Sequence, residues 1–331
     1  MFTPIQTSLG AWLLFQGSSG LLVHNGAVFG ISSLISGSVF SPSRDNVPII
    51  AGLVSSILPV YLLAPSLLPS YPAAPDSLAT AATTFGVGLL LGWGTKNGRG
   101  CTSGHMLCGI SRLSARSIIS TAIFFTTALI TANVVGGGSN IPPCGPSTPC
   151  YTAMSPSTPE LAFISGAVIL STITNFFIIP KTFTRTETCR IAFAYIAGLE
   201  FGLGLLISGM ADSAKVLRFF ALPTDPSRFD PSLALIMAFG LGPSLVTYLS
   251  LEPGQSLDKD KPAANPTLAE RWRLPTATVA DIDWRFVAGA LAFGVAWGLK
   301  GVCPGPALLR SFLQPSWGLV TVSGYFVGNL F

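Results

Sequence analysis

The chain has 331 residues, of which 49% are apolar and only 10% are charged, whereas about 25% of the residues of an average soluble domain are charged. With a mean hydropathy of +0.60, the chain has too few charged side chains to hydrate the surface of a globule of this size, so we exclude an ordinary water-soluble protein and expect a membrane protein. The net charge is only +4 and the basic residues are scattered, which excludes nucleic acid as a partner because phosphate binding needs clustered Lys and Arg.

Nine apolar runs are long enough, or nearly long enough, to cross a bilayer, which takes about 20 helical residues. The first Lys or Arg is Arg44, so the first run lacks the basic start of a secretory signal and we expect it to stay as a transmembrane helix. The nine runs cover residues 10–23, 47–68, 79–94, 115–136, 160–180, 191–207, 230–249, 284–299 and 315–331.

Four of these runs, the first, third, sixth and eighth, are short and lead through a Gly-rich break into a second short apolar piece. We expect these pieces to be central half-helices, and they cover residues 26–37, 103–113, 212–221 and 304–313.

The order broken, full, broken, full occurs twice, which indicates a duplicated unit. The repeats are 1–136 and 191–331, and 137–190 holds an outer loop and a connecting helix. Since that helix is unpaired, the second repeat must enter the membrane from the opposite face. The sequence therefore predicts an all-α polytopic membrane protein with nine transmembrane helices, four central half-helices and inverted repeats, an architecture typical of transporters.

Positive charge predicts the orientation. Most Lys and Arg residues, including those of the loops 181–190 and 251–283, fall on one side of this topology, which we place in the cytoplasm. The N-terminus is then outside and the C-terminus inside. The polar stretch 251–275 is expected to be a partly disordered cytoplasmic tether. In the uncharged outer loop, Cys144 and Cys150 either form a disulfide or remain two free thiols.

The segment GWGTKNGRGCTSGHMLCGISRLSARS at 92–117 contains the densest group of unusual residues. Its glycines, Gly100 and Gly104 among them, free backbone N–H groups, and a half-helix beginning near Ser103 favours an anion at its N-terminus. Lys96 and Arg99 add positive charge. The segment GVAWGLKGVCPGP at 294–306 repeats the design, with Lys300 before the break. Cys101 and Cys303 are thus each placed at the start of a half-helix, facing one central passage.

Three roles are open to these thiols. A metal site is disfavoured because Cys101, Cys108, Cys303 and His105 lack a tight ligand spacing, and nucleophilic catalysis is disfavoured because His105 is the lone nearby base. The third role is weak S–H donation to a sulfur-containing anion, which adds no repelling charge. We therefore expect no metal, no cofactor and no enzymatic activity.

The motifs GCTSGHMLCGISRLSARS, SGMADSAKVLRFF and GVCPGPALL resemble the YeeE/YedE sulfur-transport family over nearly the whole chain. The resemblance implies an hourglass-shaped protein of nine crossings that takes up thiosulfate along a path of cysteines, matched here by Cys101 and Cys303. Some members carry a further cysteine in the first break, where this chain has LLVHNG. Either His24 or Asn25 substitutes as a donor there, or the relay has fewer steps.

Weaker path candidates are Cys108 and Lys215. Cys108, two helical turns past Cys101, is either a path residue or a packed small apolar residue. Lys215 either attracts the anion from outside or is a charge at a helix end. A cytoplasmic sulfurtransferase is a candidate partner. The alternatives to thiosulfate import are a permease for another small sulfur or selenium species and a membrane-embedded thiol relay or sulfurtransferase.

Overall fold

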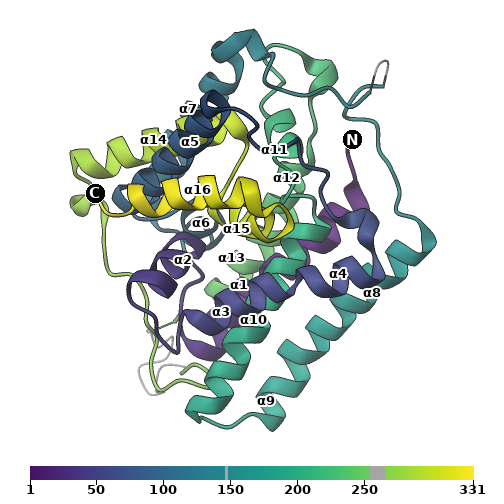
Figure 1. Cartoon of the computed structure of the whole chain (residues 1–331). Helices are drawn as coiled ribbons and strands as arrows, with labels where there is room; N and C mark the ends of the chain where they lie inside the picture. Colours follow the sequence, from purple (N-terminus) through teal and green to yellow (C-terminus); the bar gives the residue numbers. More distant parts are fainter. Residues whose placement is uncertain (146–147, 254–264) are drawn as a thin grey trace.

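The computed structural model describes residues 1–145, 148–253 and 265–331 (Figure 1). Within these ranges the chain is helical, and its only β-type pairings are two isolated bridges. The longer helices are α1 (Pro4–Asn25), α3 (Val47–Ser55) with α4 (Ile57–Leu63), α5 (Leu78–Asn97), α7 (Ala115–Val134), α8 (Thr158–Ile173) continued by η4 (Thr174–Ile178) and α9 (Ile179–Thr182), α10 (Glu187–Ile207), α12 (Ser232–Ile236) continued by η6 (Met237–Leu241) and α13 (Gly242–Leu251), α14 (Trp284–Lys300) and α16 (Pro315–Gly328). The short helices after the breaks are α2 (Ile31–Phe40), η2 (Thr102–Leu107) with α6 (Cys108–Ile110), α11 (Ser213–Phe219) and α15 (Pro304–Leu313).

All nine predicted runs and all four predicted half-helices are helical over most of their length. In the described part of the chain, five helices are long and apolar enough to cross a membrane, or six if the bent pair α14 and α15 is one span. Helix α1 falls outside this group because it carries buried polar side chains such as Gln16, Ser18 and Ser19. A helix that faces protein rather than lipid need not be uniformly apolar. The count of nine crossings stays a prediction.

The long helices pack in pairs through glycines. A Cβ atom at Gly92 of α5 would lie 1.9 Å from the backbone oxygen of Tyr325 in α16, and one at Gly328 of α16 would lie 2.2 Å from that of Leu89 in α5. Gly198 of α10 has the same relation to the backbone oxygen of Ile49, at 2.0 Å. Small residues at helix contacts allow such close backbone approach in membranes.

Each of the four broken helices ends in the left-handed region that favours glycine. Gly26 (φ 66°), Gly209 (φ 76°) and Gly301 (φ 62°) follow α1, α10 and α14, and Arg99 (φ 54°) precedes Gly100 (φ 153°) after α5. A side chain at Gly301 would also meet the backbone oxygen of Ser213 at 2.2 Å. The breaks are therefore encoded by specific residues.

The segment 265–273 packs against the end of α1, where a disordered tether was expected. The backbone N–H groups of Thr267, Leu268 and Arg273 donate to carbonyl oxygens of residues 23, 24 and 26, at 3.1, 2.8 and 2.7 Å. Asp45 holds the far end of this segment by accepting from Arg273 at 2.5 Å and from Arg190 at 2.8 Å. Lys259 and Lys261, which contributed to the expected charge of loop 251–283, lie outside the described residues.

Neutralising Asp45 is expected to release the segment 265–273. The hydrogen bond from Arg273 holds the pKa of Asp45 below its ordinary value, against the effect of burial. The ionised carboxylate therefore stabilises the docked segment above the ordinary Asp pKa of about 4, and this contribution is lost as the pH falls through the lowered value. We expect Asp45→Asn to increase trypsin cleavage after Arg271 and Arg273 several-fold at neutral pH. The control is Glu187→Gln, which breaks the highly exposed pair with Arg44; an equal increase there would contradict the assignment.

Candidate functional site

The four short helices meet at a central cavity of about 70 Å³. Each contributes to the lining: Ile31 comes from α2, Thr102 from η2, Val216 from α11 and Gly305 from α15. The long helices α1, α10, α12 and α14 supply the remaining wall, which is largely apolar. Because segments from both halves of the chain build this cavity, it is the place where a repeat interface would lie.

Thiol and hydroxyl groups from the two Gly-Cys motifs lie together at this cavity. Cys303 lines it, and the hydroxyl of Thr102 donates to the Cys303 sulfur at 3.4 Å. Cys101 is fully buried and is not among the lining residues, but its sulfur lies 3.3 Å from the hydroxyl oxygen of Ser103, which does line the cavity. The N–H of Ile31 donates to that same oxygen at 3.2 Å. The two motifs are thus joined at one point.

Trp297 supplies a further donor at the cavity. Its side chain lines the cavity and is 2% exposed, and its Nε1 has no hydrogen-bond partner among the described residues. An indole N–H can only donate, and a buried donor without a partner is costly. The arrangement is suited to an acceptor that arrives from outside the protein.

Two larger hollows lie at opposite ends of α5. The first, of about 750 Å³, is lined by Lys300, Val302 and Arg310 together with Thr80 near the start of α5. The second, of about 670 Å³, is lined by Lys96, Arg99 and Gly100 at its end. We call them the Lys300 hollow and the Lys96 hollow. Val302 of the Lys300 hollow precedes Cys303, and Gly100 of the Lys96 hollow lies two residues before Thr102, so each hollow is lined by residues next to those that line the central cavity.

His105 holds the Gly-rich turn and is not among the residues that line the cavity. Its Nδ1 pairs with the hydroxyl of Ser117 at 3.1 Å, and its Nε2 pairs with the carbonyl oxygen of Gly98 at 2.9 Å. The ring fills the space beside Gly100, where a Cβ atom would lie 2.7 Å from Nε2. Gly100 therefore needs to be glycine for both its φ angle and its neighbour, and His105 acts here as a structural residue.

The structure does not bring five other candidates to the cavity. Cys108 donates to the carbonyl oxygen of Phe29 at 3.3 Å, beside a separate small void. Lys215 is buried and donates to the hydroxyls of Thr3 and Thr7. His24 is buried against Phe193, and Gly104 is not among the lining residues. Asn25 likewise points elsewhere, since its amide donates to the carbonyl oxygen of residue 190.

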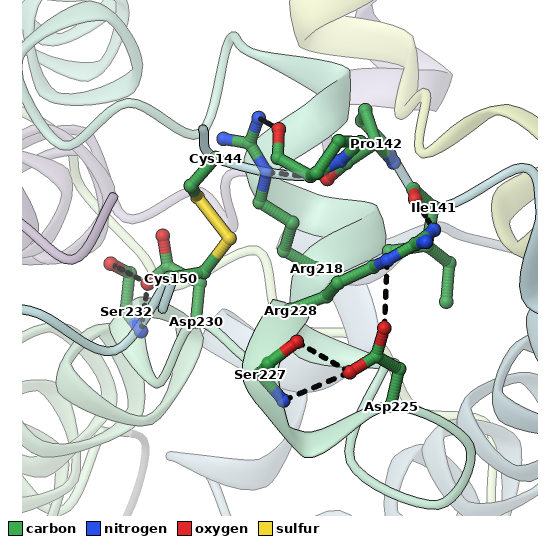
Figure 2. The surroundings of a disulfide bond; sticks show 11 residues. Ile141, Pro142, Cys144, Cys150, Arg218, Asp225, Ser227, Arg228, Asp230 and Ser232 are labelled. Atoms are coloured by element: carbon green, nitrogen blue, oxygen red, sulfur yellow. Dashed lines mark hydrogen bonds and ion pairs between the residues drawn. A yellow bond between two sulfur atoms is a disulfide. The ribbon is translucent and has the colours of Figure 1, made fainter. Parts of the chain in front are cut away.

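Cys144 and Cys150 are joined by a disulfide, with their Cα atoms 5.3 Å apart. Figure 2 shows Arg218 and Arg228 beside it. Arg218 donates to the carbonyl oxygens of residues 142 and 143 at 3.0 Å each, and Arg228 donates to that of Ile141 at 2.7 Å. These contacts fix the loop after α7 to the region of α11 and α12.

Sequence reasoning missed Trp297 and Thr102 as cavity residues. Both are inside the quoted motifs, but neither residue type singles itself out in an apolar run. AWGLKG and GWGTKN each place a tryptophan one or two turns before a break. This symmetry could have predicted that Trp297 lies at the cavity.

Known proteins resemble the chain in two regions. The family described as "Sulphur transport" matches residues 62–130, and a family of unknown function, DUF6691, matches residues 189–330. A Xylella fastidiosa (strain Temecula1) protein named "Probable transporter" is 39% identical over 130 residues, which are 39% of this chain and 92% of that protein. A second protein of that name from the same strain is 36% identical over 122 residues, which are 37% of this chain and 74% of that protein. Both relatives are much shorter than this chain.

Proposed function

Because the chain belongs to the YeeE/YedE family of sulphur-transport membrane proteins, we propose that this membrane transporter imports thiosulfate, or a closely related sulfur anion, through the central cavity. The observation that carries the proposal is the cavity itself. It brings together Cys303, Thr102, Ser103 and Trp297 at the meeting point of four half-helices, and the buried indole N–H of Trp297 has no hydrogen-bond partner among the described residues.

The chemistry of the path supports an anion that binds loosely. Lys96 and Arg99 are the charged residues among the described lining of the Lys96 hollow, so that hollow attracts negative charge. In the Lys300 hollow, Lys300 and Arg310 share the lining with Asp76 and Asp212. The central cavity offers neutral donors. Neutral S–H, O–H and N–H groups hold an anion without a full countercharge that would trap it, as passage requires. The anion then passes from Lys300 past Cys303 and Thr102 to Lys96.

An inverted duplication is part of the proposal, supported by the way the helices pair. In the duplication, α1 corresponds to α10, α3 to α12 with η6, α5 to α14 and α7 to α16. The contact of α3 with α10 then matches the contact of α12 and η6 with α1, and the contact of α5 with α16 matches that of α14 with α7. The two pairs that map onto themselves, α1 with α10 and α5 with α14, also pack together. Nine crossings and an hourglass of two hollows are part of the same proposal.

The orientation is tested by thiol labelling in intact cells. The proposal places Cys144 and Cys150 outside and Cys189 in the cytoplasm. After mild reduction, an impermeant maleimide is expected to label the loop pair at once and Cys189, which lies at the surface near the start of α10, only after permeabilisation. Immediate labelling of Cys189 would reverse the orientation.

Uptake of labelled thiosulfate tests the function. Cells without their own sulfur-anion importers are expected to accumulate label when they express the chain, and unlabelled thiosulfate should compete more strongly than sulfite or selenite. Preferential competition by sulfite or selenite would assign another substrate. A persulfide on Cys303 found by mass spectrometry after exposure would assign a thiol relay instead.

A further inference from the structure

Glu200 is an acidic side chain in the middle of a helix that is long and apolar enough to cross a membrane. It is the 14th of the 21 residues of α10 and is 5% exposed. Ionisable side chains at such positions are costly and are functional candidates by default. The cavity chemistry described above does not use this residue, so its presence needs a separate explanation.

Neutral groups alone hold the Glu200 carboxyl. The hydroxyl of Ser171 donates to Oε1 at 2.8 Å, and the Asn175 amide nitrogen donates to Oε1 at 2.8 Å and to Oε2 at 3.1 Å. None of the ion pairs among the described residues involves Glu200. Burial without a cation penalises the charged carboxylate relative to the neutral acid. The site is therefore one that can take up a proton.

Asn175 is arranged to serve both protonation states. Its amide oxygen is buried and has no hydrogen-bond partner, and it lies beside Gly20, where a Cβ atom would come within 2.4 Å. With the amide as it stands, its N–H groups donate to the carboxylate. A half-turn of the amide presents its oxygen to the O–H of the neutral acid. When Glu200 is neutral, the Asn175 amide oxygen thus gains the hydrogen bond that it lacks when Glu200 is ionised.

Among the titratable groups on the elements around Glu200, His24 is the one that reaches Asn175. The His24 ring of α1 interacts with the backbone of Asn175, and its Nδ1 pairs with the hydroxyl of Thr267 at 3.0 Å. Helix α1 has no other ionisable side chain and α3 has none. Glu160 at the start of α8 accepts from Ser66.

Within α10 itself, Tyr195 pairs with the hydroxyl of Ser55, Arg190 with Asp45 and Glu187 with Arg44. Glu200, Asn175, His24 and Thr267 therefore form one line of polar groups, which runs from mid-helix to the docked segment 265–273.

We propose that Glu200 and Asn175 form a proton-binding site that couples anion movement to a proton, with His24 on its path to the cytoplasmic side. This inference rests on the transport function proposed above. Import of an anion is opposed by an inside-negative membrane potential, and a proton moving inward with it offsets part of that charge. The mechanical link is short, since Phe201, the next residue of α10, and Leu14 of α1 line the central cavity.

The test uses the full chain in proteoliposomes with labelled thiosulfate. Counterflow exchange without any gradient reports the anion path alone, and uptake under an inward proton gradient reports coupling. We expect the gradient to raise the initial rate of wild-type uptake several-fold. Glu200→Gln, which keeps the shape and stays neutral, is expected to exchange within about twofold of wild type and to lose the response to the gradient. Ser171→Ala removes a donor but keeps the carboxyl and should retain the response.

The outcomes separate the two proposals. Absence of counterflow in wild type overturns the transport function, whatever the state of Glu200. Counterflow with a gradient response that survives in Glu200→Gln, or no gradient response in wild type, overturns the proton site. Loss of the response in both Glu200→Gln and Ser171→Ala also overturns it, because the network would then act as a clamp for α8. The infrared C=O band of a neutral carboxyl, which Glu200→Gln should remove, gives a readout independent of transport.

Discussion

Replacing Cys303 by alanine is expected to reduce thiosulfate uptake by about fivefold or more at matched membrane expression. The side chain lines the central cavity and its sulfur already accepts from Thr102 at 3.4 Å, so the S–H is free to donate to a passing sulfur anion. Removing a neutral hydrogen-bond donor from a buried site costs about 1–3 kcal/mol, and about 1.4 kcal/mol is a factor of ten in rate. The measurement is the initial rate of labelled uptake in cells without other importers.

The remaining cysteines provide the matched series. Cys101→Ala is expected to lose activity as well, because the Cys101 sulfur lies 3.3 Å from the Ser103 hydroxyl at the cavity wall. Cys189→Ala, on the surface of α10, should transport like wild type, and Cys303→Ser should retain part of the rate. Full activity in both Cys101→Ala and Cys303→Ala would show that hydroxyl, indole and backbone groups hold the anion and that the thiols do not.

Substitution of Gly92 by alanine is expected to destabilise the folded protein strongly, whereas Gly86→Ala on the same helix should not. A Cβ atom at Gly92 would lie 1.9 Å from the Tyr325 backbone oxygen, while one at Gly86 meets nothing within 4 Å. Overpacking of this kind costs about 1–3 kcal/mol or more. At Gly86, alanine instead favours the helix by about 0.5–1 kcal/mol. The two substitutions should therefore move stability in opposite directions.

The readout is the fraction of purified protein that remains monodisperse in detergent after stepwise heating. Gly92→Ala should lose this fraction at a temperature several degrees below wild type, and Gly86→Ala at the wild-type temperature or above. Equal midpoints for the two variants would mean that α5 and α16 do not pack as closely as described.

Hydrophobic periodicity and Gly-rich breaks were sufficient to place the helices along the chain. The length of an apolar run and the Gly and Pro residues that end it are local properties of the sequence. The break before Pro304 and the one after Asn97 could therefore be predicted. The number of membrane crossings could not be predicted in the same way. Helix α1 packs against α10 and carries the buried polar residues Gln16 and Ser18. Its hydropathy therefore does not indicate whether it crosses the membrane.

The site was partly predictable for a similar reason. Cys101 and Cys303 stand out because each opens a helix after a break, and the structure joins their motifs through Thr102. His24 and Lys215 are equally conspicuous in the sequence, yet partners distant along the chain bury them: Phe193 and Thr267 for the histidine, Thr3 and Thr7 for the lysine. Which unusual residue faces the passage is decided by tertiary packing, which a single sequence does not encode locally.

The reciprocal glycine contacts between α5 and α16 affect the rate at which the protein can change conformation. Helices that touch backbone to backbone, as α5 and α16 do at Gly92 and Gly328, cannot slide past one another without breaking a close-packed contact. Large rocking of one half against the other would have to cross that barrier, on the microsecond-to-millisecond scale of collective motion. Displacement of side chains and short helices around a small cavity requires no such step. Turnover in this protein should accordingly depend on local displacement of the short helices and of the side chains at the cavity, such as Cys303 and Thr102, and should show a shallower temperature dependence than rocking of whole halves would give.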